Sequence, residues 1–308
     1  MSRKVGFLGL GEIGGALCAW VARSEKHEVS AYDVDAARVE VAAGHGAHAA
    51  SSMAQLAQAA DIIVANLPDP GVVRGVFTGA GGLIESVRPG TVIFDFTTVD
   101  PQTSKELASA FAARSALYVD TPHSGSKHDA ARGSLPLIVG ATEAELKEWL
   151  PFLRVVSSSL HFVGARGAGS AVKLVNNVMS MGNLLVAAEA FALGVKAGVD
   201  AGTLFNVIQY FGGSSQRLVT RFPSVLKGEF GPRFPIQLAE QHLDIALETA
   251  RRLEVPMEMA QACREVYHRA NEVAADGADV TAVVQFLERL AGVELRGDAQ
   301  IASIKWGG

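Results

Sequence analysis

Short apolar runs alternate with stretches of helical periodicity in the first half of the chain. Continuous apolar runs of about four to eight residues are typical of strands buried in a parallel sheet, whereas apolar residues that recur every three to four positions indicate a helix. The predicted strands are Val5–Leu8, Glu28–Asp33, Ile62–Leu67, Thr91–Phe96, Leu117–Asp120 and Leu137–Gly140. The predicted helices are Gly15–Arg23, Ala36–Ala43, Met53–Ala59 and Pro101–Ala113. This alternation predicts an α/β fold with a doubly wound parallel sheet and right-handed crossovers.

From residue 168 onward the pattern changes to one helix after another. The predicted helices are Ala168–Ala197, Ala201–Tyr210, Pro235–Leu253, Glu258–Ala274 and Thr281–Ala291. Glycines and prolines separate them. We therefore expect two domains, an α/β domain over residues 1–166 and an all-α domain over residues 167–308. The first of these helices is apolar beyond what one contact face requires, so the second domain is also expected to form an oligomer.

Charge and composition narrow the range of partners. The formal net charge is −5, and no Lys/Arg-rich run occurs, which argues against binding to nucleic acid or to an anionic membrane surface. No uninterrupted apolar run reaches about 18 residues, so no transmembrane helix is predicted. The two cysteines, Cys18 and Cys263, lie in apolar helical patterns without a CxxC or Cys/His cluster. We therefore expect buried thiols, no metal site and a cytoplasmic protein, although a disulfide between the two stays open.

The glycines near the N-terminus have the spacing of a dinucleotide-binding loop. Gly9, Gly11 and Gly14 form a GxGxxG pattern that follows the first predicted strand and opens a helix. In that context the first glycine permits a tight turn, the second lets the backbone approach a pyrophosphate, and the third lets helix and strand pack closely. Free N–H groups at the helix start would then face the phosphates. We expect a Rossmann-type domain in which Gly9, Gly11, Glu12, Ile13 and Gly14 contact the cofactor. A glycine-rich turn without a ligand is the alternative.

An acidic residue ends the second predicted strand. Asp33 follows the last of these glycines by about 20 positions, where the fingerprint requires an acceptor for the ribose hydroxyls. The next residues are Val34 and Asp35, so a 2′-phosphate would meet carboxylate repulsion. This arrangement favours NAD over NADP. The alternative for Asp33 is a helix N-cap before Ala36–Ala43, a position that Asp35 fills better.

Two further segments carry candidate chemistry. Asp120–Ser126 follows a strand and is rich in small residues, whose consecutive backbone N–H groups can hold a carboxylate, although a plain loop of turn formers has the same composition. Lys173 and Asn177 lie four positions apart at the start of the long predicted helix, so they share a face. The helix dipole disfavours a positive charge at that end, and a lysine so placed can act as general acid or base. A solvated surface lysine is the alternative.

In this order, the segments resemble the motifs of the β-hydroxyacid dehydrogenase family, typified by 3-hydroxyisobutyrate dehydrogenase and tartronate semialdehyde reductase. Gly9–Gly14 resembles GLGxMG with Ile13 in place of Met, Asn66-Leu67-Pro68 resembles MLP, Asp95–Thr98 followed by Pro101 resembles DxST…P, Asp120–Ser126 resembles DxPVSGG, and Gly167–Asn177 resembles GxGxxxKxxNN. The last motif is the most specific of the five, and together they cover nearly the whole chain.

The resemblance implies an NAD-dependent oxidoreductase that acts on CH–OH groups and transfers a hydride between NAD and a small 3-hydroxy acid or the corresponding semialdehyde. It implies that Lys173 exchanges the proton with the substrate hydroxyl, and that Asn177 orients substrate and lysine. The expected carboxylate-binding residues are Ser124, Gly125 and Ser126, and those lining the nucleotide or nicotinamide site are Leu67, Pro68 and Thr98. It further implies a helical domain like that of 6-phosphogluconate dehydrogenase, and a homodimer or homotetramer.

The chain departs from the family pattern at several positions. Ser126 stands where the family has glycine, and His123 replaces a small apolar residue. Gln241 and His242 stand in place of a Lys-Asp pair within Phe234–Leu243. Loss of that lysine should weaken the attraction for an anionic substrate, and Gln241 is then expected to hydrogen-bond the substrate. His242 is expected to be a solvated or core histidine rather than a ligand.

Two other functions remain open from the sequence. Imine reductases share the expected architecture but commonly carry another residue at the lysine position, so Lys173 argues against them while Gln241 keeps them in consideration. Some relatives keep the nucleotide site, lose the lysine and serve as interaction modules without catalysis. The Lys173/Asn177 pair argues against this second alternative.

Overall fold

The computed structural model describes residues 2–231 and 233–300. The chain divides into two compact units, Met1–Leu174 and Val175–Gly308, here called the N-terminal unit and the helical unit. The division falls inside the long helix α9 (Ala168–Lys196), so the first two turns of this helix belong to the N-terminal unit.

A six-stranded parallel sheet forms the centre of the N-terminal unit. Its strands are β1 (Lys4–Leu8), β2 (Glu28–Tyr32), β3 (His48–Ala49), β4 (Ile62–Ala65), β5 (Val92–Asp95) and β6 (Leu117–Asp120). Their order across the sheet is β3-β2-β1-β4-β5-β6. This is the order of a dinucleotide-binding doubly wound sheet, in which the direction of winding reverses between β1 and β4. The predicted fold class is confirmed.

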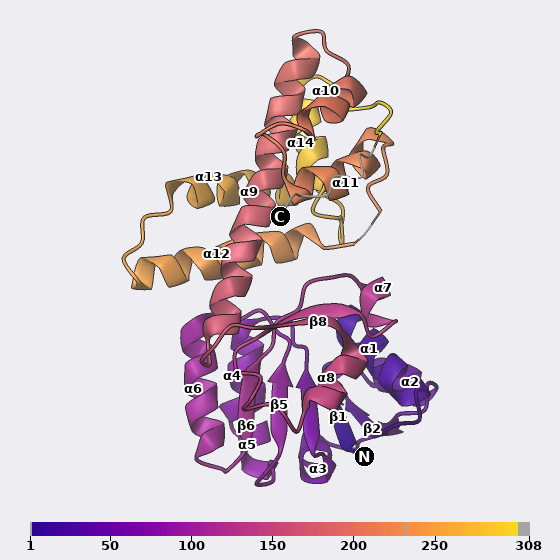
Figure 1. The fold of residues 1–308 in the computed structure, drawn as a ribbon, viewed down its shortest axis with the longest axis vertical. Helices are drawn as coiled ribbons and strands as arrows, with labels where there is room; N and C mark the ends of the chain where they lie inside the picture. The colour runs from indigo at the N-terminus through magenta and orange to yellow at the C-terminus, as the bar shows by residue number, and fades with distance from the viewer. Residues whose placement is uncertain (1, 232, 301–308) are drawn as a thin grey trace. The chain divides into compact units, whose positions relative to one another are not determined.

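The sheet is covered on both faces because its strands are apolar on both faces. Along β4 and β5, successive residues alternate between two hydrophobic clusters, as the two-residue repeat of a strand requires. The helices of this unit are α1 (Glu12–Arg23), α2 (Ala36–Ala43), α3 (Met53–Ala59), α4 (Pro70–Thr78), α5 (Leu83–Ser86), α6 (Pro101–Ala112), α7 (Lys127–Ala130) and α8 (Leu150–Val156). Figure 1 shows α4 and α6 on one side of the sheet and α1, α2 and α8 on the other.

The last predicted strand of this unit lies outside the six-stranded sheet. It forms β7 (Leu135–Val139), which pairs in parallel with β8 (Ser157–Phe162). On its other side β7 runs antiparallel to the segment that continues β6, because Ser124 N donates to the carbonyl of Pro136 and Ile138 N to that of Pro122. The segment that contains the predicted carboxylate site is therefore held as an extended chain against β7.

Helices surround one core in the helical unit. They are the remainder of α9, α10 (Ala201–Ile208), α11 (Gln216–Leu226), α12 (Ile236–Arg252), α13 (Glu258–Glu272) and α14 (Ala282–Ala291). Every one of them contributes to a single hydrophobic cluster, in which the α9 side chains include Leu184 and Phe191. The prediction of an all-α second half is confirmed.

The long helix α9 is apolar enough in composition to meet a criterion for membrane-spanning helices, although it contains no uninterrupted apolar run. Among the described residues, α9 alone is long and apolar enough by length and composition to cross a membrane, with a mean hydropathy of 1.6 in its 18-residue window. Polar residues such as Asn176 and Asn177 interrupt its apolar sequence. A helix at the core of a soluble protein meets the same criterion.

Both cysteines are free thiols. Cys18 lies in the core of the N-terminal unit and Cys263 in that of the helical unit. Burial raises the pKa of each thiol to about 12. The prediction of buried thiols is confirmed, and the disulfide that the sequence left open is not formed.

Candidate active site

The glycine loop between β1 and α1 is packed so closely that two of its glycines admit no side chain. Gly9 has φ of +89°, and a Cβ there would lie 2.3 Å from the carbonyl oxygen of Asn66. A Cβ on Gly14 would lie 2.1 Å from the carbonyl oxygen of Gly9. Non-glycine residues rarely adopt such a φ value, and backbone atoms cannot yield to a clash of this size. Gly9 and Gly14 therefore have the turning and packing roles that their spacing predicts.

The start of α1 is open to a ligand. Gly11 is the N-cap of this helix and provides no side-chain cap, and a Cβ on it would meet nothing within 4 Å. The first N–H groups of α1 therefore lack the side-chain acceptor that caps most helices, and they can bind a phosphate. The helix begins at Glu12, three residues before the predicted start, because the glycines do not interrupt it. Of the two other predicted contact residues in the loop, Glu12 is exposed and Ile13 packs against the core.

Asp33 holds the glycine loop from the end of β2. Its carboxylate accepts hydrogen bonds from Leu10 N at 2.6 Å and Asp35 N at 2.9 Å. Asp35 is the N-cap of α2 and accepts from Ala37 N, as expected. Arg38, which was not among the predicted site residues, lies 3.8 Å from Asp33 and 3.2 Å from Asp35. Its guanidinium offsets part of the acidic charge that was expected to repel a 2′-phosphate.

The loops after β4 and β5 meet at the carboxyl edge of the sheet. Leu67 N donates to the Thr97 hydroxyl at 3.0 Å, and Thr97 N donates to the Asp95 carboxylate at 3.0 Å. Pro68 is exposed and Thr98 is partly exposed beside this pair. These residues therefore lie at the edge where open parallel sheets bind their ligands.

The loop that follows β6 presents Ser124 and Gly125 on its exposed side. Gly125 has φ of +120°, which a side chain would strain. Ser126 has a different role, because it is the N-cap of α7 in a capping box with Asp129. Both its amide and its hydroxyl donate to the Asp129 carboxylate, at 2.8 and 2.7 Å. A substrate carboxylate at Ser126 would compete with Asp129, whereas Ser124 and Gly125 have no such partner among the residues that the structure describes.

Lys173 is anchored to the same loop. Its Nζ donates to the carbonyl oxygen of His123 at 2.8 Å, and the side chain is half-buried. His123 in turn lies 3.5 Å from the Asn66 amide, measured from its Nε2. Since Asn66 also contacts Gly9, a continuous line of contacts leads from the glycine loop through Asn66 and His123 to Lys173.

The start of α9 is capped by a residue from another element. The Asp120 carboxylate, at the end of β6, accepts from Gly167 N and from Ser170 N, both at 2.9 Å. Burial raises the pKa of Asp120, and the two backbone N–H groups oppose that rise. No sequence pattern places an acceptor 50 residues away at a helix start, so this role was missed. By accepting these two hydrogen bonds, Asp120 positions the turn of α9 that carries Lys173.

Asn177, Gln241 and His242 lie in the helical unit. Asn177 is buried, and its amide Nδ2 lies 3.0 Å from Nδ1 of His242. His242 is 8% exposed and its ring lies 5.7 Å from that of Phe234. It is therefore a core histidine, one of the two expected alternatives, and its contact with Asn177 was not foreseen. Gln241 is half-buried on α12 next to it.

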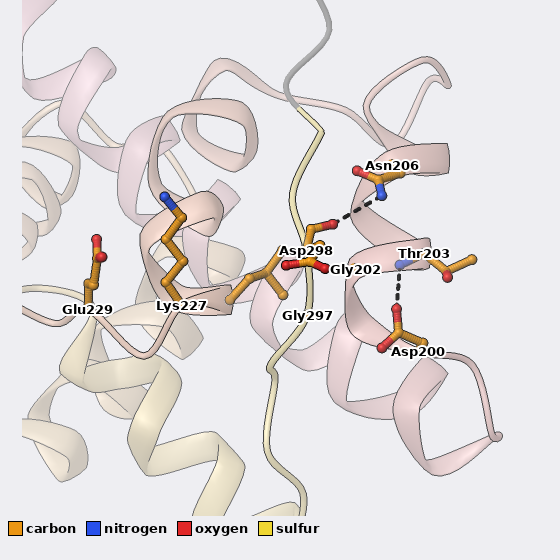
Figure 2. A pocket seen from close by; sticks show the side chains of 9 residues that line it. Asp200, Gly202, Thr203, Asn206, Lys227, Glu229, Gly297 and Asp298 are labelled. Atoms are coloured by element: carbon orange, nitrogen blue, oxygen red, sulfur yellow. Dashed lines mark hydrogen bonds between the residues drawn. The ribbon is translucent and has the colours of Figure 1, made fainter.

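A separate hollow lies elsewhere in the helical unit. It has a volume of about 600 Å³ and is lined from α10, the end of α11 and residues 297–298. Figure 2 shows that polar groups around it form hydrogen bonds with one another: Asp200 accepts from Thr203 N, and Asn206 donates to the carbonyl of Asp298. None of the predicted site residues lines it. In the described part of the chain, no group of three His, Cys, Asp or Glu side chains could hold a metal ion.

Two family models together match most of the chain. Residues 4–164 match the NAD binding domain of 6-phosphogluconate dehydrogenase. Residues 167–287 match the NAD-binding domain of NADP-dependent 3-hydroxyisobutyrate dehydrogenase.

Individual relatives agree with these models over nearly their full length. The chain is 33% identical to 2-(hydroxymethyl)glutarate dehydrogenase from Eubacterium barkeri, over 96% of this chain and 98% of that protein. It is 30% identical to 3-sulfolactaldehyde reductase from Escherichia coli, over 94% of this chain and 97% of that protein. Among solved structures, Mycobacterium tuberculosis 3-hydroxyisobutyrate dehydrogenase with L-serine has a TM-score of 0.87 at 28% identity, covering 93% of this chain and 99% of that one. The chain belongs to the β-hydroxyacid dehydrogenase family of NAD(P)-dependent oxidoreductases.

Proposed function

We propose that the enzyme transfers a hydride between NAD and a small 3-hydroxy acid, or the corresponding semialdehyde, with Lys173 as the general acid/base. The observation that carries the proposal is the line of contacts from Gly9 through Asn66 and His123 to Lys173. It brings a half-buried amine to the edge of the sheet at which a dinucleotide binds.

The glycine loop fits a dinucleotide. Gly9 and Gly14 leave no room for side chains, and the start of α1 offers uncapped N–H groups to a pyrophosphate. Asp33 lies at the end of β2, where an acceptor for the ribose hydroxyls is required, and this supports NAD. Arg38, which pairs with Asp33 and Asp35, is the residue whose replacement would test a role for NADP. When bound, the nicotinamide accepts or supplies the hydride.

The residues around Lys173 suit proton transfer from a hydroxyl. Ser124 and the amide of Gly125 would bind the substrate carboxylate, so that the hydroxyl comes within reach of Nζ. Lys173 then takes the hydroxyl proton in oxidation and returns it in reduction. The carbonyl oxygen of His123, which accepts from Nζ, stabilises the ammonium that forms. Asp120 keeps the first turn of α9 in place, and Asn177, held by His242, would orient the substrate.

The relatives support this class of substrate. Their names specify 2-(hydroxymethyl)glutarate, 3-sulfolactaldehyde and 3-hydroxyisobutyrate. Each is a small molecule with an acidic group and a hydroxyl or aldehyde. Both features match the proposed roles, in which Lys173 exchanges a proton with the hydroxyl or aldehyde oxygen and the Ser124–Gly125 loop binds the acidic group.

A homo-oligomer is part of the proposal. Four large apolar side chains on α9 are more than half exposed in the single chain, namely Val175, Met179, Val186 and Leu193 at 59%, 61%, 55% and 73%. A second copy of the chain is the occupant that we propose for this face. The helical pattern of Ala168–Ala197 predicts such an assembly.

A substrate and cofactor panel tests the function. Purified enzyme would be assayed with 3-hydroxyisobutyrate, 2-(hydroxymethyl)glutarate and L-threonate, each with NAD⁺ and with NADP⁺, and with a cyclic imine in the presence of NADH and of NADPH. We expect turnover of at least one hydroxy acid with kcat/KM higher for NAD than for NADP. Turnover of the imine alone would contradict the proposal in favour of an imine reductase. NAD binding without turnover of any compound would favour a silent binding module.

A further inference from the structure

A row of buried polar side chains runs through the N-terminal unit beside the candidate active site. They lie on β5 and just after it, on β6, on α6 and in the first turn of α9. None is more than 4% exposed, and in order they are Thr97, Asp95, Tyr118, Ser104 and Ser170. A buried hydroxyl or carboxyl is unfavourable unless it forms hydrogen bonds, so the partners of each group reveal its role.

Asp95 is at the centre of the row, and one arm leads from it to the loop after β4. Leu67 N donates to the Thr97 hydroxyl oxygen at 3.0 Å. The Thr97 amide donates to the Asp95 carboxylate at 3.0 Å, and the Thr97 side chain also forms a hydrogen bond with it. A threonine hydroxyl has a single proton, so this one points at the carboxylate. Leu67 is among the residues expected to line the nicotinamide site.

The other arm leads from Asp95 to α9. The Tyr118 hydroxyl donates to the Asp95 carboxylate at 2.9 Å. Burial raises the pKa of Tyr118, whereas a hydrogen bond from Ser104 lowers it, as a donor to the phenol oxygen must. The Ser104 and Ser170 hydroxyls lie 2.8 Å apart. Because the Ser104 proton is used on Tyr118, Ser170 is the donor of this last pair.

Both arms therefore donate toward one carboxylate. Burial raises the pKa of Asp95 to about 6, so this group is ionised at pH 8. A hydrogen bond to an ionised acceptor is stronger than one between neutral groups, and successive hydrogen bonds polarise one another. The negative charge of Asp95 thus determines the direction of every donor in the row and holds the hydroxyls in one arrangement.

The second arm ends one turn before Lys173. Ser170 is held twice, by its hydroxyl to Ser104 and by its amide to the Asp120 carboxylate at 2.9 Å. Residues three apart on a helix are neighbours, so a shift of Ser170 also moves Lys173. Every residue of the row lies within the N-terminal unit, as does Lys173.

We propose that Tyr118, Ser104 and Ser170 are positioning residues for the reaction. They hold the turn of α9 that carries Lys173 against Asp95, and so against the loop expected to line the nicotinamide. The inference rests on the proposed function of Lys173 as the general acid/base. A proton-transfer group must lie within hydrogen-bond reach of the reacting hydroxyl, and a displacement of about 1 Å can lower a rate by about 10²-fold. Loosening the row should therefore affect turnover more than binding.

Tyr118→Phe removes one hydroxyl of the row and keeps the ring. At pH 8, with the hydroxy acid that the wild type turns over, we expect kcat to fall by about tenfold to a hundredfold. KM and the Kd for NAD should stay within about twofold. Thr91→Val is the matched control, because the Thr91 hydroxyl is equally buried but donates to the carbonyl of Ala60 at the opposite edge of the sheet. It should leave kcat within about twofold of the wild type.

A double-mutant cycle tests whether the row acts through Lys173. In a Lys173→Ala background, Tyr118→Phe should lower kcat by less than about twofold, because residues that act as a unit are not additive. An equal loss in both backgrounds, or a Tyr118→Phe enzyme with kcat within about twofold of the wild type, would overturn the inference. If Tyr118→Phe does not fold, Ser170→Ala removes the hydroxyl at the far end of the arm and is judged by the same outcomes.

Hydrogen exchange separates this inference from the proposed function. The backbone amides of Gly167 and Ser170 should exchange faster in Tyr118→Phe than in the wild type or the control, because the row no longer holds the first turn of α9. Unchanged exchange, with turnover lost in Lys173→Ala, would overturn the inference alone. Faster exchange, with Lys173→Ala at the wild-type rate, would contradict the proposed function and leave the holding of the turn intact.

Discussion

Buried carboxylates at the ends of β5 and β6 hold the loops around the candidate site. Asp95 is 1% exposed and accepts from Thr97 N and from the Tyr118 hydroxyl, the latter at 2.9 Å. Burial raises its pKa to about 6, although the hydrogen bonds from Thr97 and Tyr118 oppose the rise. This carboxyl is therefore stabilised in its protonated form relative to the unfolded chain.

A pH dependence of stability follows from Asp95. An unfolded aspartate has a pKa of about 3.9, so between about pH 4 and pH 6 the folded state binds more protons than the unfolded state. The free energy of unfolding should fall as pH rises through this window, by an amount on the order of 3 kcal/mol, and stay lower above it. Urea unfolding between pH 4 and 8 should show this fall in the wild type and a smaller fall in Asp95→Asn, in which the raised pKa of Asp120 remains. Asp244→Asn, at a side chain that is 51% exposed, should keep it. An identical slope in the wild type and Asp95→Asn would contradict the assignment.

Some residue roles follow from sequence and others require the fold. The glycine loop and the N-cap Asp35 were predictable because spacing and neighbours along the chain determine them. The roles of Arg38 and His242 were not predictable, since they depend on partners that the fold brings close. The capping of Ser126 by Asp129 was local and could have been found from the Ser-x-x-Asp pattern.

The elements that were missed have weak or contradictory patterns. In α4, Gly71 and Gly75 interrupt the apolar periodicity, and in α11 Pro223 lies inside the helix. Strand β8 begins with Ser157-Ser158-Ser159 and is only partly buried, so it lacks the apolar run that marks the central strands. Its partner β7 was found as a strand but assigned to the main sheet, because an apolar run does not specify the sheet to which it belongs.

The first turn of α9 depends on an acceptor from β6. Asp120→Ala should leave the buried N–H groups of Gly167 and Ser170 without a partner and destabilise the protein by about 1–3 kcal/mol for each group. Because this turn carries Lys173, we expect kcat to fall by at least tenfold while the Kd for NAD changes little. Steady-state kinetics measures kcat, and fluorescence titration measures the Kd for NAD.

Asp100→Ala is the matched control for this element. Asp100 is also buried, at 3% exposed, and accepts from the first N–H groups of α6. Its loss should destabilise the protein to a similar degree but leave kcat near the wild-type value. If Asp120→Ala and Asp100→Ala affected kcat equally, Asp120 would have a structural role only.

At the scale of the whole molecule, the alternation of strands and helices followed by helices alone predicted the fold class. The exposed apolar face of α9 leads to a prediction about assembly. Replacing Met179 and Leu193 by glutamate should convert a dimer or larger assembly into monomers at micromolar concentration, as measured by light scattering after gel filtration. Val41→Glu, at a side chain that is 63% exposed on α2, should leave the assembly unchanged. A wild-type protein that is monomeric under these conditions would contradict the prediction.

The central claim is that the amine held by the carbonyl of His123 transfers the substrate proton. The most direct measurement compares Lys173→Ala with Lys196→Ala, an exposed lysine in the last turn of the same helix, using the hydroxy acid that the wild type turns over. We predict that Lys173→Ala lowers kcat by about 10²–10⁴-fold, the usual contribution of a general acid/base, while its Kd for NAD stays within about twofold and Lys196→Ala is unaffected. A Lys173→Ala enzyme that retained more than about a tenth of the wild-type rate would contradict the account.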